Sequence, residues 1–125
     1  MSEYKMIVLD LDGTLTNRNK EITPKTKETL MKAQEQGKIV VLASGRPTYG
    51  VMPLAEELHL EDYGGYILSF NGGIIMNCKT KEVVFSRQIP AESNGKIIDL
   101  AQENNIGVTL VVWGAITNID LLSGI

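Results

Sequence analysis

Residues 6–16 read MIVLDLDGTLT, and this stretch decides the fold class. Its apolar run at 6–9 is short and partly β-branched, which is typical of a strand buried on both faces in a parallel sheet. Asp10 follows the run directly, and the polar residues and glycine at 12–14 end it. The stretch therefore predicts a strand with two carboxylates, Asp10 and Asp12, at its C-terminal end.

The sequence that follows repeats this strand pattern with helices between the copies. Residues 24–37 predict a helix with Thr23 as its cap and a proline in its first turn. Apolar runs at 39–43 and 66–70 predict two more strands, with an irregular helix over 48–59 between them. Strands that alternate with helices indicate a parallel sheet with right-handed crossovers. We therefore expect an α/β fold.

The sequence pattern changes after residues 71–73. Short apolar runs at 74–76 and 83–85 flank a polar stretch, which predicts an antiparallel hairpin. A helix over 90–105 and a strand over 108–113 are predicted to follow. We expect two parts, one at 1–72 and a partial α/β subdomain at 73–125.

Composition and charge narrow the class of partner. The chain has 125 residues, of which 43% are hydrophobic, so it can fill a core. Its net charge is −3 with both signs interspersed, which argues against a nucleic-acid or anionic-membrane surface. The single cysteine, Cys78, excludes an intramolecular disulfide, and the charged N-terminus is unlike a signal peptide. We expect a cytoplasmic protein that acts on small molecules.

Asp10 and Asp12 form the first part of a candidate site. In an extended backbone residues i and i+2 point to the same face, so the two carboxylates can converge beyond the strand end, where open parallel sheets bind ligands. Two close carboxylates repel unless a cation joins them, and Mg²⁺ commonly takes one or two carboxylates together with a phosphate. The alternative is a solvated turn that closes the strand. We favour a site for magnesium and phosphate.

Ser44, Gly45 and Arg46 end the second predicted strand just before a helix. A hydroxyl, free backbone N–H groups and a guanidinium suit a phosphate, and Gly45 lets the backbone approach closely. Parallel neighbouring strands would bring Ser44 to the sheet edge that carries Asp10. The alternative is a helix cap followed by a surface arginine.

Three motifs in this order resemble one family. They are Asp-Leu-Asp-Gly-Thr-Leu at 10–15, Ala-Ser-Gly-Arg-Pro at 43–47 and Phe-Asn-Gly-Gly at 70–73. Together they strongly resemble the haloacid dehalogenase (HAD) superfamily, and more narrowly the Cof-type sugar-phosphate phosphatases. The resemblance implies that 1–72 is the N-terminal part of a Rossmann-like core, with its first three strands and two helices, and that 73–125 begins an α/β cap.

The resemblance also implies a mechanism. The chain would be a magnesium-dependent phosphatase that hydrolyses a small phosphorylated metabolite such as a sugar phosphate. Asp10 would be the nucleophile that forms an aspartyl-phosphate, and Asp12 the general acid and then the base. Mg²⁺ would be held by the Asp10 carboxylate and the Asp12 backbone carbonyl. The implied phosphate- and substrate-binding residues are Ser44, Gly45, Arg46, Asn71 and Gly72.

The sequence departs from the family pattern in its second half. Family members carry a lysine and a Gly-Asp-x-x-Asn-Asp segment beyond the cap, and this sequence has neither, so we expect a truncated chain with weak or no turnover. The rival interpretation is a non-catalytic fragment that binds Mg²⁺ or phosphate loosely, or self-associates through an exposed sheet edge. A receiver-like phosphoacceptor domain is disfavoured by the Ser44-Gly45-Arg46 position. Asn71-Gly72, taken alone, is equally typical of a hairpin turn.

Overall fold

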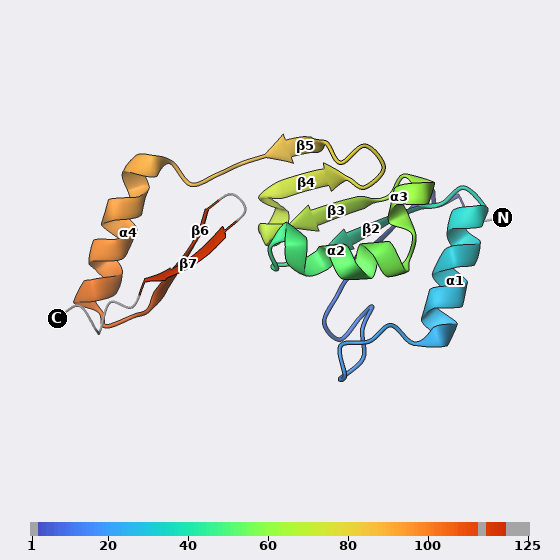
Figure 1. Cartoon of the computed structure of the whole chain (residues 1–125), viewed down its shortest axis with the longest axis horizontal. Coiled ribbons are helices and arrows are strands. Elements are labelled where there is room, and N and C mark those ends of the chain that lie inside the picture. Colours follow the sequence, from blue (N-terminus) through green and yellow to red (C-terminus); the bar gives the residue numbers. More distant parts are fainter. Residues whose placement is uncertain (1–2, 113–114, 120–125) are drawn as a thin grey trace. The chain divides into compact units, whose positions relative to one another are not determined.

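A five-stranded mixed sheet carries the first part of the chain (Figure 1). The computed structural model describes residues 3–112 and 115–119. The strands lie in the order β1 (Met6–Asp10), β2 (Ile39–Ala43), β3 (Tyr66–Ser69), β4 (Ile74–Asn77) and β5 (Val83–Ser86). The first three are parallel, whereas β4 and β5 each run antiparallel to the preceding strand. The predicted α/β class is confirmed.

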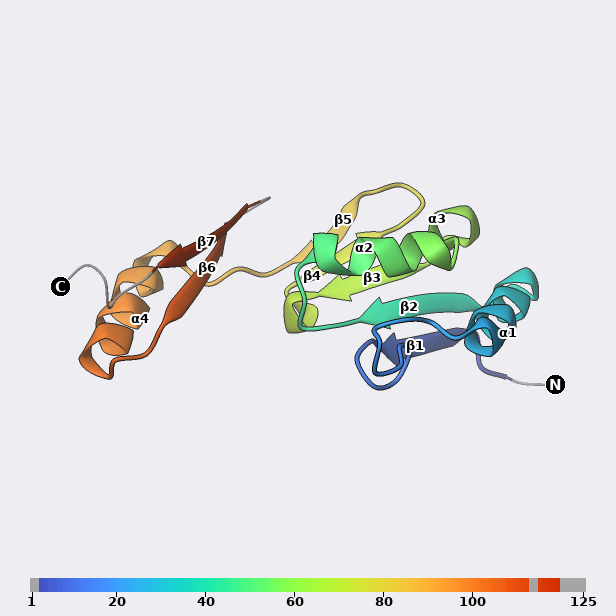
Figure 2. The same ribbon diagram turned by 60° about the horizontal axis from the view of Figure 1, so that its bottom comes forward.

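Helices make the two crossovers between the parallel strands. They are α1 (Pro24–Glu35) between β1 and β2, and α2 (Thr48–Glu57) with α3 (Leu60–Tyr63) between β2 and β3. α1 begins as predicted, because Thr23 Oγ1 accepts a hydrogen bond from the backbone N–H of Thr26 at 3.4 Å. The helix expected over 48–59 ends earlier, since His59 adopts a left-handed φ of 56° and α3 starts after it. Figure 2 shows α2 lying along β3.

The buried apolar side chains form one cluster that includes the motif at 10–15. Leu11 and Leu15 are 0% and 3% exposed, and full burial of a leucine contributes about 1.5–3 kcal/mol. These two leucines therefore anchor the loop after β1, while its carboxylates stay outside the core. The other members of the cluster are Ile22, Leu30, Val40, Leu42, Val51, Ala55, Leu58, Leu60, Ile67, Met76 and Cys78.

β1 is not buried on both faces, so this prediction was wrong. Val8 is 58% exposed, whereas Val41, its partner in the register with β2, is 6% exposed. The reason is that the helices pack mainly against β2 and β3, so the face of β1 that carries Val8 lacks such a cover among the described residues. An apolar run predicts a strand, but it does not encode which faces of that strand the helices will cover.

The hairpin at residues 74–86 lies in the same sheet as the parallel strands. β4 pairs with β3, with Ser69 opposite Ile74 and Tyr66 opposite Asn77. The chain accordingly divides into two compact units at Met1–Arg87 and Gln88–Ile125. This division falls later than the boundary expected at residues 72 and 73, because the ladder between β3 and β4 ties the hairpin to the first unit.

The second unit contains α4 (Ala91–Glu103), β6 (Val108–Val112) and β7 (Ala115–Ile119). β6 and β7 pair antiparallel. The helix expected over 90–105 and the strand expected over 108–113 are both found, except that Trp113 lies outside the described residues. Among the helices of the described residues, none combines the length and the apolar character that a bilayer crossing requires.

Candidate active site

The loop after β1 is folded around one backbone carbonyl. The oxygen of Leu11 accepts hydrogen bonds from Thr14 N at 3.2 Å, from Thr16 N at 3.0 Å and from Thr16 Oγ1 at 3.1 Å. Gly13 has a φ of 79°, a conformation that glycine adopts without steric cost. The tight loop buries the leucines at 11 and 15 and keeps Asp10 and Asp12 at the C-terminal end of β1.

The segments that follow β2 and β3 are bonded to each other through their backbones. Ser44 N donates to Leu68 O at 2.9 Å, and Ser44 O accepts from Asn71 N at 3.1 Å. Arg46 O accepts from Phe70 N at 3.0 Å. The structure therefore joins the predicted motifs at 43–47 and 70–73, as expected for the carboxyl ends of neighbouring parallel strands.

Asn71 lies directly over Gly45. A Cβ at position 45 would be 3.0 Å from Asn71 Oδ1, which is closer than side chains ordinarily pack. Phe70 and Asn71 both have positive φ values, 51° and 55°, which non-glycine residues rarely adopt. The segment does connect an antiparallel strand pair, as its turn-like sequence indicates, and it also brings the Asn71 amide to the end of β2.

A cleft of about 180 Å³ opens at this edge of the sheet. It is lined by Asp10, Ala43, Ser44, Gly45, Leu68 and Asn71. Each of these residues stands at or just after the carboxyl end of a parallel strand, which is where open α/β sheets bind ligands. Four of the predicted site residues thus share one cleft, whereas Asp12, Arg46 and Gly72 are not among its lining residues.

Asp12 and Arg46 form an ion pair. Arg46 Nη2 donates to Asp12 Oδ1 at 2.7 Å, and Lys20 Nζ donates to the same oxygen at 2.7 Å. The hydrogen bond from the Lys20 ammonium is the largest cause that holds the pKa of Asp12 below its ordinary value. Desolvation, the second-largest effect, opposes this lowering, and the Arg46 guanidinium adds to it. Arg46 was predicted to bind phosphate, and the structure places its guanidinium on Asp12. Lys20 was missed, because its contact with a residue eight positions earlier depends on the path of the loop between them.

The oxygen donors for a metal ion are few. Among the described residues, no three or more His, Cys, Asp or Glu side chains gather in one group. Asp10 lines the cleft, and the backbone carbonyl of Asp12 accepts no hydrogen bond from the described part of the chain. Mg²⁺ keeps several waters and takes one or two carboxylates plus a substrate phosphate, so this small oxygen set fits it.

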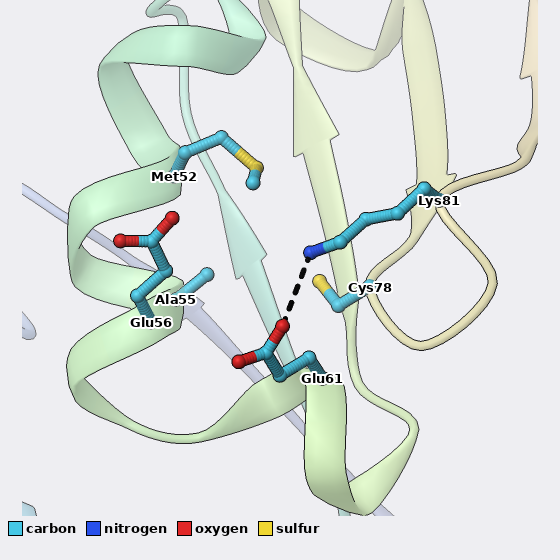
Figure 3. A pocket seen from close by; sticks show the side chains of 6 residues that line it. All are labelled: Met52, Ala55, Glu56, Glu61, Cys78 and Lys81. Atoms are coloured by element: carbon cyan, nitrogen blue, oxygen red, sulfur yellow. Dashed lines mark ion pairs between the residues drawn. The ribbon is translucent and has the colours of Figure 1, made fainter.

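A second hollow lies at the opposite end of the sheet (Figure 3). It is lined by Met52, Ala55, Glu56, Glu61, Cys78 and Lys81, and Lys81 Nζ lies 3.6 Å from Glu61 Oε2. Cys78, in the turn between β4 and β5, is 2% exposed, and its backbone N–H donates to Gly65 O at 2.9 Å, before β3 begins. The hollow has a volume of about 10 Å³, room for about one water molecule, and is therefore too small for a substrate.

Comparison with known proteins places these features in a family. The family model for haloacid dehalogenase-like hydrolases matches residues 7–119. A haloacid dehalogenase-like hydrolase from Bacteroides thetaiotaomicron, whose crystal structure is known, is 47% identical, with a TM-score of 0.85 over 96% of this chain and 45% of its own. YxeH of Bacillus subtilis (strain 168) is 36% identical over 100 residues, which are 80% of this chain and 37% of YxeH.

A third relative is named for its substrate. The 5-amino-6-(5-phospho-D-ribitylamino)uracil phosphatase YwtE of Bacillus subtilis (strain 168) is 33% identical over 94 residues, 75% of this chain and 30% of its own length. The chain thus spans less than half the length of each of these three proteins. With the matching fold and the motifs at the ends of β1, β2 and β3, the family predicted from the sequence is confirmed, and the chain belongs to the haloacid dehalogenase-like hydrolases, in their Cof-type branch.

Proposed function

We propose that this chain carries the nucleophile of a magnesium-dependent phosphomonoester hydrolase that acts on a small phosphorylated metabolite such as a sugar phosphate. The observation that carries the proposal is the cleft shared by Asp10, Ser44 and Asn71 at the carboxyl ends of three parallel strands. A carboxylate, a hydroxyl and an amide in one open cleft can attack a phosphoryl group and hold its oxygens. All the residues that line the cleft belong to the first unit.

Ser44 is prepared to donate a hydrogen bond to a phosphoryl oxygen. Its Oγ accepts a hydrogen bond from the backbone N–H of Arg46 at 3.0 Å, so the hydroxyl proton is left to donate elsewhere. The side chain is held in place because Ser44 is 8% exposed and its backbone is bonded to Leu68 and Asn71. Ser44 is therefore the group in the cleft best suited to orient a phosphate against Asp10.

Two steps complete the proposed reaction. An oxygen of Asp10 attacks phosphorus, and the bond from phosphorus to the leaving oxygen breaks with its electron pair on that oxygen, which takes a proton from Asp12. Water then attacks the aspartyl-phosphate and gives a proton back to Asp12, which releases inorganic phosphate and free Asp10. The lowered pKa keeps the Asp12 carboxyl ionised before substrate arrives. The ionised form can accept the proton of water in the second step, whereas for the first step Asp12 must take up a proton beforehand.

The Asp10 carboxylate and the Asp12 backbone carbonyl would hold Mg²⁺. A bound Mg²⁺ neutralises charge between an anionic nucleophile and an anionic phosphate. The Asp12 side chain is not offered as a ligand, since its Oδ1 is already paired with two cations. The name of YwtE, a phosphatase of a phosphorylated ribityl compound, supports a small phosphorylated metabolite as the substrate class.

Phosphate release by the 125-residue chain tests the proposal. The chain is incubated with Mg²⁺ and either a panel of sugar phosphates or p-nitrophenyl phosphate, beside Asp10→Asn and the control Asp99→Asn, an exposed aspartate on α4. Slow release by the parent and by Asp99→Asn, but not by Asp10→Asn, is the expected result. If the folded parent releases no phosphate, the chain is not an enzyme by itself.

The exposed edge of β1 favours a second candidate function, a module that associates with another copy of itself. β1 has one strand neighbour among the described strands, and its Met6 and Val8 side chains are 49% and 58% exposed. Unpaired edges with apolar side chains promote association. Light scattering over a range of chain concentrations, with phosphate release measured in the same samples, separates a self-associating module from a phosphatase.

A further inference from the structure

The Asp12 carboxylate is held through one of its two oxygens. Lys20, from the loop between β1 and α1, and Arg46, from the loop after β2, both donate to Oδ1 at 2.7 Å. Among the hydrogen bonds of the described residues, none reaches Oδ2. Two cations from separate segments thus fix the orientation of the group and leave a single oxygen for other partners.

The loop that presents Lys20 is closed by its own hydrogen bonds. Asn17 Oδ1 accepts from the backbone N–H groups of Asn19 at 2.9 Å and Glu21 at 3.1 Å, and Asn17 N donates to Glu21 O at 2.9 Å. Lys20 N donates to Asn17 O at 3.0 Å, with a left-handed φ of 64°. Ile22, buried at 7% exposure, anchors the end of the loop. The backbone of Lys20 is therefore fixed where its ammonium reaches Asp12.

The contact between Lys20 and Asp12 contributes little to folding. The two side chains are 65% and 46% exposed, and ion pairs in solvent are weak because water screens them and both side chains lose rotamer freedom. A contribution to folding stability therefore does not account for the ordered loop that places the Lys20 ammonium beside the Asp12 carboxylate. The contact instead holds the carboxylate of Asp12, two positions after the cleft residue Asp10.

We propose that Lys20 is a positioning residue that, with Arg46, clamps Asp12 by Oδ1 so that Oδ2 exchanges the proton with the leaving group. This inference rests on the proposed phosphatase function. In the first step the proton on Oδ2 passes to the leaving oxygen as its bond to phosphorus breaks, and in the second step Oδ2 takes a proton from the attacking water. Lys20 touches neither substrate nor phosphate in this scheme.

Leaving groups of different basicity test the inference. An alkoxide leaving group, as from glucose 6-phosphate, needs a proton, whereas p-nitrophenolate is a weak base that leaves without one. For an enzyme that forms a phosphorylated aspartate, kcat/KM reports the step in which the leaving group departs. Lys20→Met should lower kcat/KM about tenfold or more for glucose 6-phosphate and leave it within about twofold for p-nitrophenyl phosphate, since general acid catalysis contributes at least that much.

Two further variants exclude simpler explanations. Lys20→Arg should restore most of the lost kcat/KM, because a guanidinium can make the same contact with Oδ1. Lys25→Met, which removes an exposed lysine from the first turn of α1, should change neither substrate's kcat/KM. An equal loss on both substrates, or no loss on either, would overturn the inference while leaving the phosphatase function intact. No phosphate release from either substrate by the parent would contradict the proposed function, and the inference with it.

The contact itself has a readout that does not depend on activity. In chain labelled with ¹⁵N lysine, the ammonium of Lys20 should give a signal protected from exchange at low temperature, assigned by its loss in Lys20→Met. The signal should be lost in Asp12→Asn and kept in Asp99→Asn. A parent without a protected Lys20 signal would show that the clamp does not exist.

Discussion

Strands β1 and β2 have nearly the same sequence pattern and different surroundings. Each is a run of apolar residues, and each is followed by the polar residues of the cleft. β2 lies between two parallel neighbours and buries Val40, Val41 and Leu42, whereas β1 has its one described neighbour on one side and exposes Met6 and Val8. The same pattern therefore produces an enclosed strand in one place and an open one in another, and the cleft is built across both.

The largest expected difference between the two strands is in how much a substitution in each lowers the free energy of unfolding. Leu42→Ala removes a fully buried side chain from β2 and should lower the free energy of unfolding by about 2–5 kcal/mol. Val8→Ala removes a side chain that is 58% exposed in β1 and should change it by no more than about 0.5 kcal/mol. Urea unfolding of the two variants beside the parent measures both values. Equal losses would mean that β1 is as enclosed as β2.

The parts of the fold that the sequence predicts are those set by local rules. Thr23 and the proline after it define the start of α1, and the apolar runs define three strands whose alternation with helices requires parallel pairing. The exposure of Val8 could not be predicted, because it depends on which segments pack over the face of β1. The pairing of β4 with β3 was missed for the same reason, since a hairpin pattern does not state which sheet it joins.

Some residues of the candidate site could likewise be predicted from the sequence, whereas another could not. Asp10 and Ser44 could be predicted because parallel strands align their carboxyl ends at one edge of the sheet. Lys20 could not, because its contact with Asp12 depends on a loop whose path is set by the Asn17 side chain and a left-handed φ. Of these features, the asparagine is the one visible signal, since Asn often closes such loops through its side chain.

The loops after β1 and β2 each contain a glycine, but for different physical reasons. Gly45→Ala would put a Cβ 3.0 Å from Asn71 Oδ1, so it should displace the amide and lower kcat/KM for p-nitrophenyl phosphate about tenfold. Gly13→Ala has open space but a φ of 79°, so it should lower the free energy of unfolding by about 1 kcal/mol. Loss of activity in Gly45→Ala with an unmoved Asn71 in its crystal structure would contradict the steric explanation.

The ionisation of the Cys78 thiol shows whether solvent reaches the buried region around this residue. Burial, assisted by Glu61 and opposed by Lys81, raises the pKa of its thiol from 9.0 to about 11. A raised pKa in the folded state adds stability below pH 9 that is lost as the pH rises towards 11. The free energy of unfolding should therefore fall more steeply between pH 9 and 11 in the parent than in Cys78→Ala.

Thiol reactivity gives a second measurement of the same property. At pH 8 a colorimetric disulfide reagent should leave the native chain unmodified and react with one thiol per chain in urea, because the thiolate is the reactive form and is absent from the fold. Rapid modification of the native chain would mean that the region around Cys78 opens readily.

The smallest expected change in the free energy of unfolding comes from a substitution at the exposed edge of β1. The same substitution separates an effect on folding from an effect on association. Val8→Lys places a charge on an exposed position of β1, so the free energy of unfolding should change by no more than about 0.5 kcal/mol. If the edge of β1 mediates association, light scattering should show larger particles for the parent as its concentration rises and monomers for the variant, because a lysine on an edge strand opposes strand pairing. Asp99→Lys, on an exposed position of α4, is the matched control and should associate like the parent. A parent that stays monomeric at every concentration would contradict the self-associating module, and the open edge of β1 would then be compatible with a soluble monomer.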